Sequence, residues 1–136
     1  QKTAYEIPKR DWNSDVCSSD LLDAFHGGDV PDAFGQEAFF RLVSGRLRPR
    51  GVFLANVHIA SDRNTSADVM AHRMMTTWRA VRILDRMGKR NRNAVLMAGA
   101  VRKLTRPKLH HRPAADLRYV AGALKGMRFR KLRKMA

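Results

Sequence analysis

Two short apolar runs that each stop at a polar residue dominate the pattern along the chain. The first ends in Leu21-Leu22-Asp23, the second covers residues 51–56 and stops at Asn56, and a helical pattern lies between them. This succession predicts a βαβ unit with two parallel strands. Because ligands of open α/β sheets bind outside the carboxyl ends of the parallel strands, Asp23 and Asn56 mark the edge where we expect a site.

The segment between the two runs predicts a loop over residues 26–31 and a helix over residues 36–47. The apolar residues of this helix recur at the spacing of one helical face: Phe39, Phe40, Val43 and Leu47. The Arg-Pro-Arg-Gly of residues 48–51 is expected to end the helix. Residues 52–57 are almost continuously apolar, which is typical of a strand covered on both faces.

A second helix is predicted to begin at Asn64 or Thr65, because Thr65 and Asp68 have the spacing of a capping box. Its apolar side is expected to be core: Val69, Met70, Met74 and Trp78. Residues 80–84 and 93–100 predict two further strands, and their connection is too short for a crossover helix, so they should pair antiparallel. The fold class is therefore α/β. The succession strand, helix, strand, helix and antiparallel hairpin resembles the carboxyl-terminal half of a Rossmann-like methyltransferase sheet.

Most of the positive charge lies in the carboxyl-terminal tail, residues 101–136. Of the net charge of +15, the stretch from Arg102 to Lys134 carries twelve Lys or Arg against one acid, Asp116, a net of +11. Residues 114–135 predict a helix, although Gly122 and Gly126 each weaken it by about 1 kcal/mol relative to Ala. We expect a basic, partly helical tail after a partial Rossmann-like domain over residues 22–100.

The composition fits one domain, since 136 residues with 44% hydrophobic content can bury a single modest core. No run approaches the roughly 18 consecutive apolar residues of a membrane helix, and no secretory apolar core lies near the N-terminus. Cys17 is the single cysteine, so no internal disulfide can form, and no Cys/His spacing of the zinc kind occurs. We expect a cytoplasmic protein with neither a metal nor a membrane partner.

Residues 1–21 have neither helical nor strand periodicity. They closely resemble the in-frame translation of a short-read sequencing-library adapter: residues 1–7 read QKTAYEI and residues 10–21 read RDWNSDVCSSDL. We therefore expect a non-native segment that is excluded from fold reasoning, with the natural chain starting near Leu22. The alternative is a natural polar arm.

With these segments placed, the chain resembles the spermidine synthase-like family of polyamine aminopropyltransferases, which shares the class I S-adenosylmethionine-dependent methyltransferase fold. Three segments carry the resemblance: Leu22-Asp23-Ala24-Phe25, Glu37-Ala38-Phe39-Phe40, and Leu47-Arg48-Pro49-Arg50-Gly51 before the strand that stops at Asn56. It covers residues 22–100, and it departs from the family pattern at Arg50, where Gly is usual.

The resemblance implies that Asp23 is the catalytic acid that faces the amine of the polyamine and the aminopropyl donor. A carboxylate can bind an amine as ammonium and help to remove its proton as it attacks a sulfonium-activated carbon. A cap of the following loop or helix is the alternative role. The family's second acid stands three residues later, where this chain has His26, and Asp29 is the candidate substitute. Both residues are therefore expected to contact substrate.

The resemblance also implies that the donor site lies upstream of Leu22. The glycine-rich turn that holds the donor, and the acid that binds its ribose, are absent from the sequence given. The donor of the intact enzyme would be decarboxylated S-adenosylmethionine, or S-adenosylmethionine itself, and the acceptor a polyamine or another small molecule. We expect the chain to be a truncated transferase that binds no cofactor and has no transferase activity.

Two other functions remain open on the sequence. A fragment of an S-adenosylmethionine-dependent methyltransferase would have the same fold. A non-catalytic protein that binds nucleic acid nonspecifically through the basic tail is the alternative from another class, although a solvated tail is the commoner meaning of such charge. Half of a doubly wound sheet would also leave a strand edge exposed, and a homo-oligomer would cover it.

Overall fold

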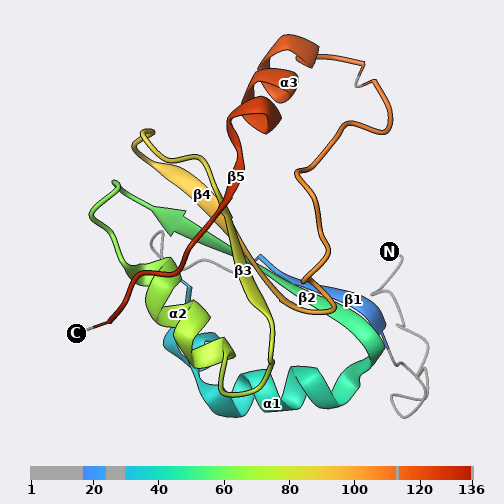
Figure 1. Cartoon of the computed structure of the whole chain (residues 1–136), viewed down its shortest axis with the longest axis vertical. Helices are drawn as coiled ribbons and strands as arrows, with labels where there is room; N and C mark the ends of the chain where they lie inside the picture. The colour runs from blue at the N-terminus through green and yellow to red at the C-terminus, as the bar shows by residue number, and fades with distance from the viewer. Residues whose placement is uncertain (1–16, 24–29, 113, 136) are drawn as a thin grey trace, which may run out of the picture.

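The computed structural model describes residues 17–23, 30–112 and 114–135. Over these residues the chain forms a five-stranded sheet in the order β1-β2-β4-β3-β5 (Figure 1). The strands are β1 (Cys17–Leu22), β2 (Leu47–Ile59), β3 (Val81–Asp85), β4 (Arg92–Gly99) and β5 (Arg128–Arg130). The helices are α1 (Glu37–Arg46), α2 (Ser66–Met74) and α3 (Leu117–Gly126), with a short 3-10 helix, η1, at Asp32–Gly35.

The predicted fold class is confirmed. β1 and β2 run parallel, with Leu22 beside Ala55, and α1 lies between them in the chain, which makes the expected βαβ unit. β4 lies between β2 and β3 and is antiparallel to both, so the predicted hairpin is also present. The sheet therefore combines a parallel pair at one edge with an antiparallel hairpin.

The core lies between the sheet and the two helices α1 and α2, which cover the same face (Figure 1). Phe53 of β2 stacks on Trp78 with their ring centroids 5.5 Å apart, and Phe40 of α1 meets the same Phe53 ring at 6.1 Å. Met70 and Met74 of α2 are buried against this cluster. The Met and Trp stripe is core, as predicted.

The opposite face of the sheet is only half covered, so the expectation that β2 is buried on both faces was wrong. Burial alternates along β2, where Phe53 and Ala55 are buried but Val52 and Leu54 are not. Met97, the β4 residue that pairs with Leu54, is half-buried as well. The continuous apolar run therefore does not reflect two covering layers over the described residues.

β2 is also longer than predicted, because residues 48–51 join the strand and do not form a turn. Cys17 pairs with Leu47 while Ser19 pairs with Val52, so the extra β2 residues bulge out of the β1 ladder. Arg50 has a φ of 69°, in the left-handed region. The prediction that Arg-Pro-Arg-Gly ends the helix is confirmed, since α1 stops at Arg46, but the strand begins at Leu47 and not at residue 52. At its other end, β2 continues past Asn56 to Ile59.

β1 begins inside the segment that we expected to be foreign. Residues 17–21 lie in this strand, so the predicted boundary at residue 21 divides a structural element. Leu21 is 59% exposed and Asp20 is exposed, because β1 is an edge strand of the sheet. Residues 1–16 lie outside the described part of the chain, and the adapter interpretation stays a prediction.

The tail helix is shorter than the predicted residues 114–135. α3 ends at Gly126, and the chain then extends so that Phe129 of β5 pairs with Leu84 of β3. A Cβ at position 126 would lie 2.6 Å from the Arg86 Nε atom, so glycine permits this close passage. The tail is therefore partly a strand of the sheet.

The start of α2 also differs from the prediction. Thr65 is the N-cap residue but its side chain makes no capping hydrogen bond, and the Ser66 N–H donates instead to Asn64 Oδ1 at 2.9 Å. Asp68 is fully buried and binds elsewhere. The predicted capping box is not formed, because the Asp68 carboxylate binds Arg130 and not the start of α2.

Gly99 is the position where the sheet tolerates least change. Its φ is 98°, and a Cβ there would lie 2.2 Å from the carbonyl oxygen of Gly51. We expect Gly99→Ala to lower the free energy of unfolding by about 2 kcal/mol or more, because strain and overlap with backbone add together. Gly122→Ala is the matched control in α3, where a Cβ meets nothing within 4 Å, and should raise it by up to about 1 kcal/mol. Urea unfolding measures both, and equal effects would contradict this account.

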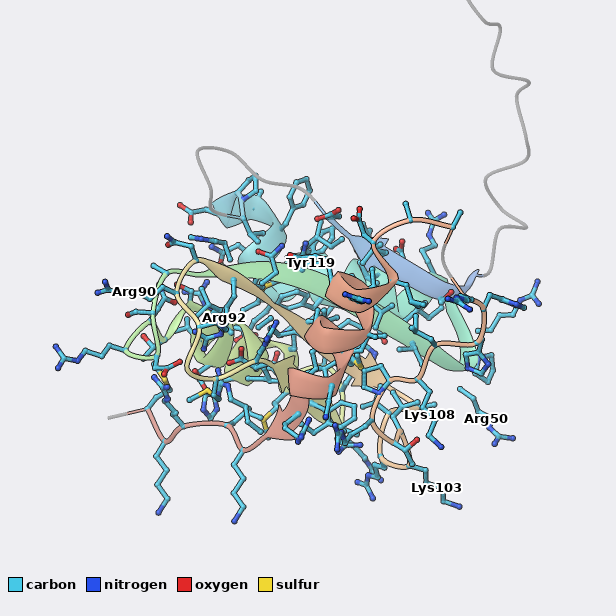
Figure 2. The ribbon with its side chains drawn as sticks, turned by 90° about the horizontal axis from the view of Figure 1, so that it is seen from above. Arg50, Arg90, Arg92, Lys103, Lys108 and Tyr119 are labelled. Atoms are coloured by element: carbon cyan, nitrogen blue, oxygen red, sulfur yellow. The ribbon has the colours of Figure 1, made fainter. Side chains whose placement is uncertain are left out.

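Arg50 occupies a backbone conformation that glycine adopts without strain. Its side chain projects outward in Figure 2. We expect Arg50→Gly to raise the free energy of unfolding by about 0.5–1 kcal/mol, since the left-handed conformation costs other residues roughly 1–2 kcal/mol and glycine's greater freedom offsets part of the gain. Arg79, an exposed loop residue outside that region, supplies the control: Arg79→Gly should lower stability. A lower free energy of unfolding in both variants would show that the backbone at position 50 is not strained.

Candidate functional site

The carboxyl ends of the parallel pair bring together the two residues at which the apolar runs stop. Asn56 Nδ2 donates to Asp23 Oδ1 at 2.9 Å. The register explains the contact, because Leu22 pairs with Ala55 and the next residue of each strand follows in step. Asp23 is exposed, so its carboxylate remains open to a ligand. Sequence reasoning thus correctly placed these two side chains at one edge of the sheet.

His26 and Asp29, the other two candidate contacts, lie outside the described residues. Their proposed roles at the substrate stay predictions. The chain is described again from Val30, and η1 follows directly after Pro31.

One polar atom of Asn56 lacks a hydrogen-bond partner among the described residues. Its side-chain oxygen is buried and accepts no hydrogen bond from the residues that the structure describes. A buried polar atom without a partner costs free energy, and native structures usually keep such atoms for a ligand, a water or a functional purpose. Beside the Asp23 carboxylate it offers a second acceptor, and two acceptors together favour a donor such as an ammonium group.

A cavity of about 390 Å³ opens where the segments that follow β1 and β2 meet. Asp32 and Gly35 of η1 line one part, His58 of β2 and Ser66 of α2 another, and Arg73 of α2 also lines it. Arg73 Nη1 donates to the Gly35 carbonyl at 3.3 Å, which ties α2 to η1.

The sequence pattern did not single out Asp32, His58 or Arg73 as site residues. A signal did exist for two of them. His58 lies two residues beyond Asn56 in the same strand, and Asp32 follows the Gly/Pro loop after Asp23. Both positions belong to the carboxyl edge of the sheet, where open α/β folds bind ligands.

A second set of charged side chains lies between the sheet and α2, and all of them except the exposed Asp62 are largely buried. It runs Asp62, Arg92, Asp85, Arg130 and Asp68, and is called the ion-pair chain below. Arg92 Nε lies 2.6 Å from Asp85 Oδ1, and Arg130 Nε lies 3.0 Å from Asp85 Oδ2. The guanidinium of Arg130 also binds both Asp68 oxygens, at 2.7 and 2.9 Å.

The electrostatics of the ion-pair chain indicate a structural role. Burial alone would raise the pKa values of Asp68 and Asp85, but hydrogen bonds and charges from the arginines outweigh it and lower both pKa values. The hydrogen bond from Asp85, opposed by burial, raises the pKa of Arg92. Strongly perturbed groups often mark active sites, yet here every buried carboxylate oxygen has an arginine partner. Among the described residues of this cluster, each carboxylate is therefore held in an ion pair.

The sequence contains one feature that could have predicted part of this cluster. Asp85 ends the apolar run of residues 81–85 just as Asp23 ends the first run. Nothing local identifies its partner Arg130, which is 45 residues away. The described residues hold no group of three or more His, Cys, Asp or Glu side chains placed to bind a metal ion. None of the described helices has the length and apolar content that a bilayer crossing requires.

Comparison with known proteins identifies the fold. The chain is similar to the crystal structure of a probable spermidine synthase from Corynebacterium glutamicum ATCC 13032, with a TM-score of 0.59 and 20% sequence identity. The match covers 87% of this chain and 43% of that chain, so this chain spans less than half the length of the solved protein. No protein-family model and no curated protein matches. The chain therefore has a spermidine synthase-like α/β fold.

The ion-pair chain predicts a defined response to acid. Because the folded-state pKa values of Asp68 and Asp85 are lowered, their contribution to stability is complete above the unfolded value of about 3.9 and is lost as pH falls through the folded-state values. We expect the free energy of unfolding to drop steeply below about pH 4. Urea unfolding across this range measures the slope.

Asp85→Asn should lower stability at pH 7 by about 3–5 kcal/mol, because buried arginines lose their partner, and should flatten the slope below pH 4. Asp20→Asn, on the exposed edge strand, is the control and should leave both unchanged. An unaltered acid slope in Asp85→Asn would contradict the assignment.

Proposed function

We propose that this chain is part of a spermidine synthase-like transferase, and that Asp23 and Asn56 hold the amine of its acceptor. The 2.9 Å hydrogen bond between these two side chains is the observation that carries the proposal. It lies at the carboxyl edge of a parallel strand pair, and the fold is similar to that of a probable spermidine synthase. Both features agree with the role of catalytic acid, which the family resemblance implies for Asp23.

The proposed chemistry assigns Asp23 two tasks. A primary amine is mostly protonated at neutral pH, so the carboxylate first binds it as an ammonium ion. As the amine loses its proton to the carboxylate, its nitrogen attacks the aminopropyl carbon next to the sulfonium of the donor. The carbon–sulfur bond breaks, and its electron pair neutralises the sulfur. The donor, decarboxylated S-adenosylmethionine, supplies the activated carbon.

Asn56 orients the acid in this proposal. Its Nδ2 donates to Asp23 Oδ1, so the other carboxylate oxygen is left for the amine. Its unpaired Oδ1 would accept a further N–H from the same ammonium group. An ammonium has three donors, and two acceptors on adjacent strands would fix its direction toward the donor carbon.

The cavity beside Val57 and His58, which Asp23 and Asn56 do not line, is proposed to hold the remainder of a polyamine. It has a volume of about 390 Å³, and the exposed Asp32 in its wall would pair with a second ammonium. Val57 and Val69 in the same wall would contact the methylenes between the charged groups. An acceptor with two or more amines separated by short apolar linkers therefore fits better than a neutral one.

Donor binding is proposed to require residues that this sequence lacks. The glycine-rich turn and ribose-binding acid expected from the resemblance do not occur in it, and the match spans 43% of the spermidine synthase. We therefore propose that the chain represents a truncated transferase, binds an acceptor amine and does not transfer an aminopropyl group. A methyltransferase would use the same fold but would not need Asp23 as a base.

Binding of a polyamine tests the acceptor site. Titration of the chain with putrescine or spermidine, followed by isothermal calorimetry or by amide NMR shifts, should show binding that Asp23→Asn weakens about tenfold or more, since one lost charge-assisted contact is worth about 1.5–3 kcal/mol. Asp20→Asn is the matched control, with the same change of charge on the strand that leads into Asp23. Equal losses of polyamine affinity in the two variants would show that the effect comes from the net charge of the chain and not from contact with Asp23.

A transfer assay on the same chain tests the rest of the proposal. With decarboxylated S-adenosylmethionine and putrescine we expect no product above the uncatalysed background. Aminopropyl transfer by the purified chain would refute the proposed truncation. Methyl transfer from S-adenosylmethionine that survives Asp23→Asn would replace the aminopropyltransferase proposal with a methyltransferase.

A further inference from the structure

Eight cations gather on the segment that leads from β4 to β5, and this segment is called the basic arm below. The arm covers residues 102–112 and 114–128, and its cations are Arg102, Lys103, Arg106, Lys108, Arg112, Arg118, Lys125 and Arg128. All eight side chains are exposed. The arm extends away from the sheet in Figure 1, and Lys103 and Lys108 reach outward in Figure 2.

None of these cations is neutralised by a carboxylate among the described residues. The salt bridges of that part of the chain join acids to Arg41, Arg92 and Arg130. Asp116 is the one acid of the arm's sequence. The acids of the body are partly consumed in the ion-pair chain, so the positive field of the arm is uncompensated, and such a field attracts polyanions.

The arm also contains a groove with both charged and apolar walls. Its volume is about 450 Å³, with Arg106, Lys108 and Lys125 beside Leu109, Ala121 and Leu124. Arg106 Nη2 donates to the Lys125 carbonyl at 2.9 Å, which ties the loop to α3. A single-stranded nucleic acid exposes its phosphates and the apolar faces of its unstacked bases together, so cations beside an apolar wall can contact both.

We propose that the basic arm binds single-stranded nucleic acid, with phosphates on the cations and a base against the apolar wall of the groove. This proposal is independent of the acceptor site at Asp23. An anionic membrane is the weaker fit. A membrane-binding helix needs a free apolar face, whereas Ala121 and Leu124 face the loop of the arm, and α3 has only ten residues with Gly122 near its middle.

Fluorescence anisotropy with a labelled oligonucleotide of about 20 nucleotides tests the proposal on the full chain. If about four phosphates are neutralised together, the affinity should fall roughly 50-fold between about 50 and 200 mM salt. A 20-base-pair duplex and phosphatidylserine vesicles serve as the competing polyanions. The proposal requires the single strand to bind at least tenfold more tightly than the duplex at equal salt.

Two variants that remove the same charge separate the arm from the net charge of the chain. The arm variant combines Arg106→Gln, Lys108→Gln, Arg118→Gln and Lys125→Gln. The control variant combines Arg63→Gln, Arg79→Gln, Lys89→Gln and Arg90→Gln, which are exposed cations outside the arm. The arm variant should lose at least tenfold more affinity than the control. Circular dichroism confirms that both remain folded.

Three results would overturn the proposal. Equal losses of oligonucleotide affinity in the two variants would show that binding depends only on net charge. Equal affinity for duplex and single strand would show that the groove does not contact bases. Capture by phosphatidylserine vesicles without oligonucleotide binding would identify a membrane surface. A further variant, Leu124→Ser, should weaken single-strand binding about threefold or more without changing the salt slope, since apolar contact with a base is insensitive to salt while phosphate contacts are not.

Discussion

The contact between Arg130 and the two buried carboxylates of Asp68 and Asp85 is the interaction on which the rest of the fold depends. One guanidinium joins α2, β3 and β5, and Asp85 extends the connection to Arg92 of β4. Burying a carboxylate without a partner is prohibitive, and removal of one partner of a buried pair costs about 3–5 kcal/mol. The end of the tail is thereby fixed to the core, and the basic arm becomes a loop closed at both ends.

This closure explains both the parts of the fold that could be predicted and those that could not. The βαβ unit and the hairpin follow from local patterns of apolar residues. So does the meeting of Asp23 and Asn56, because Leu22 and Ala55 pair in register and the next residue of each chain segment follows in step. Arg130 and Asp68 lie 62 residues apart, and no periodicity marks one arginine among twelve cations as buried. A helix through residue 135 was therefore the natural reading of the tail, yet it would have left Asp68 and Asp85 without their shared partner.

The two faces of the sheet differ in how far the described residues cover them. Phe53 and its neighbours are sealed by α1 and α2, but Leu54 and Met97 on the other face are only half-buried. β1 lies at the sheet edge with Leu21 largely exposed. In a doubly wound sheet helices cover both faces, and native sheets usually protect an edge strand by covering, charging or shortening it. The match to less than half of a spermidine synthase is consistent with these open surfaces.

The distribution of charge sets the two proposed sites apart. With a net charge of +15, the chain repels a polyamine at long range, so binding at Asp23 has to come from contacts within a few ångströms. Salt screens the repulsion as well as the attraction, with a Debye length of about 10 Å at 0.1 M, and the two effects partly cancel. At the basic arm, salt lowers the affinity in two ways that add together, because it screens the attraction and also reduces the free energy gained from counterion release. A shallow salt dependence for the amine and a steep one for the oligonucleotide would therefore identify two separate sites on one chain.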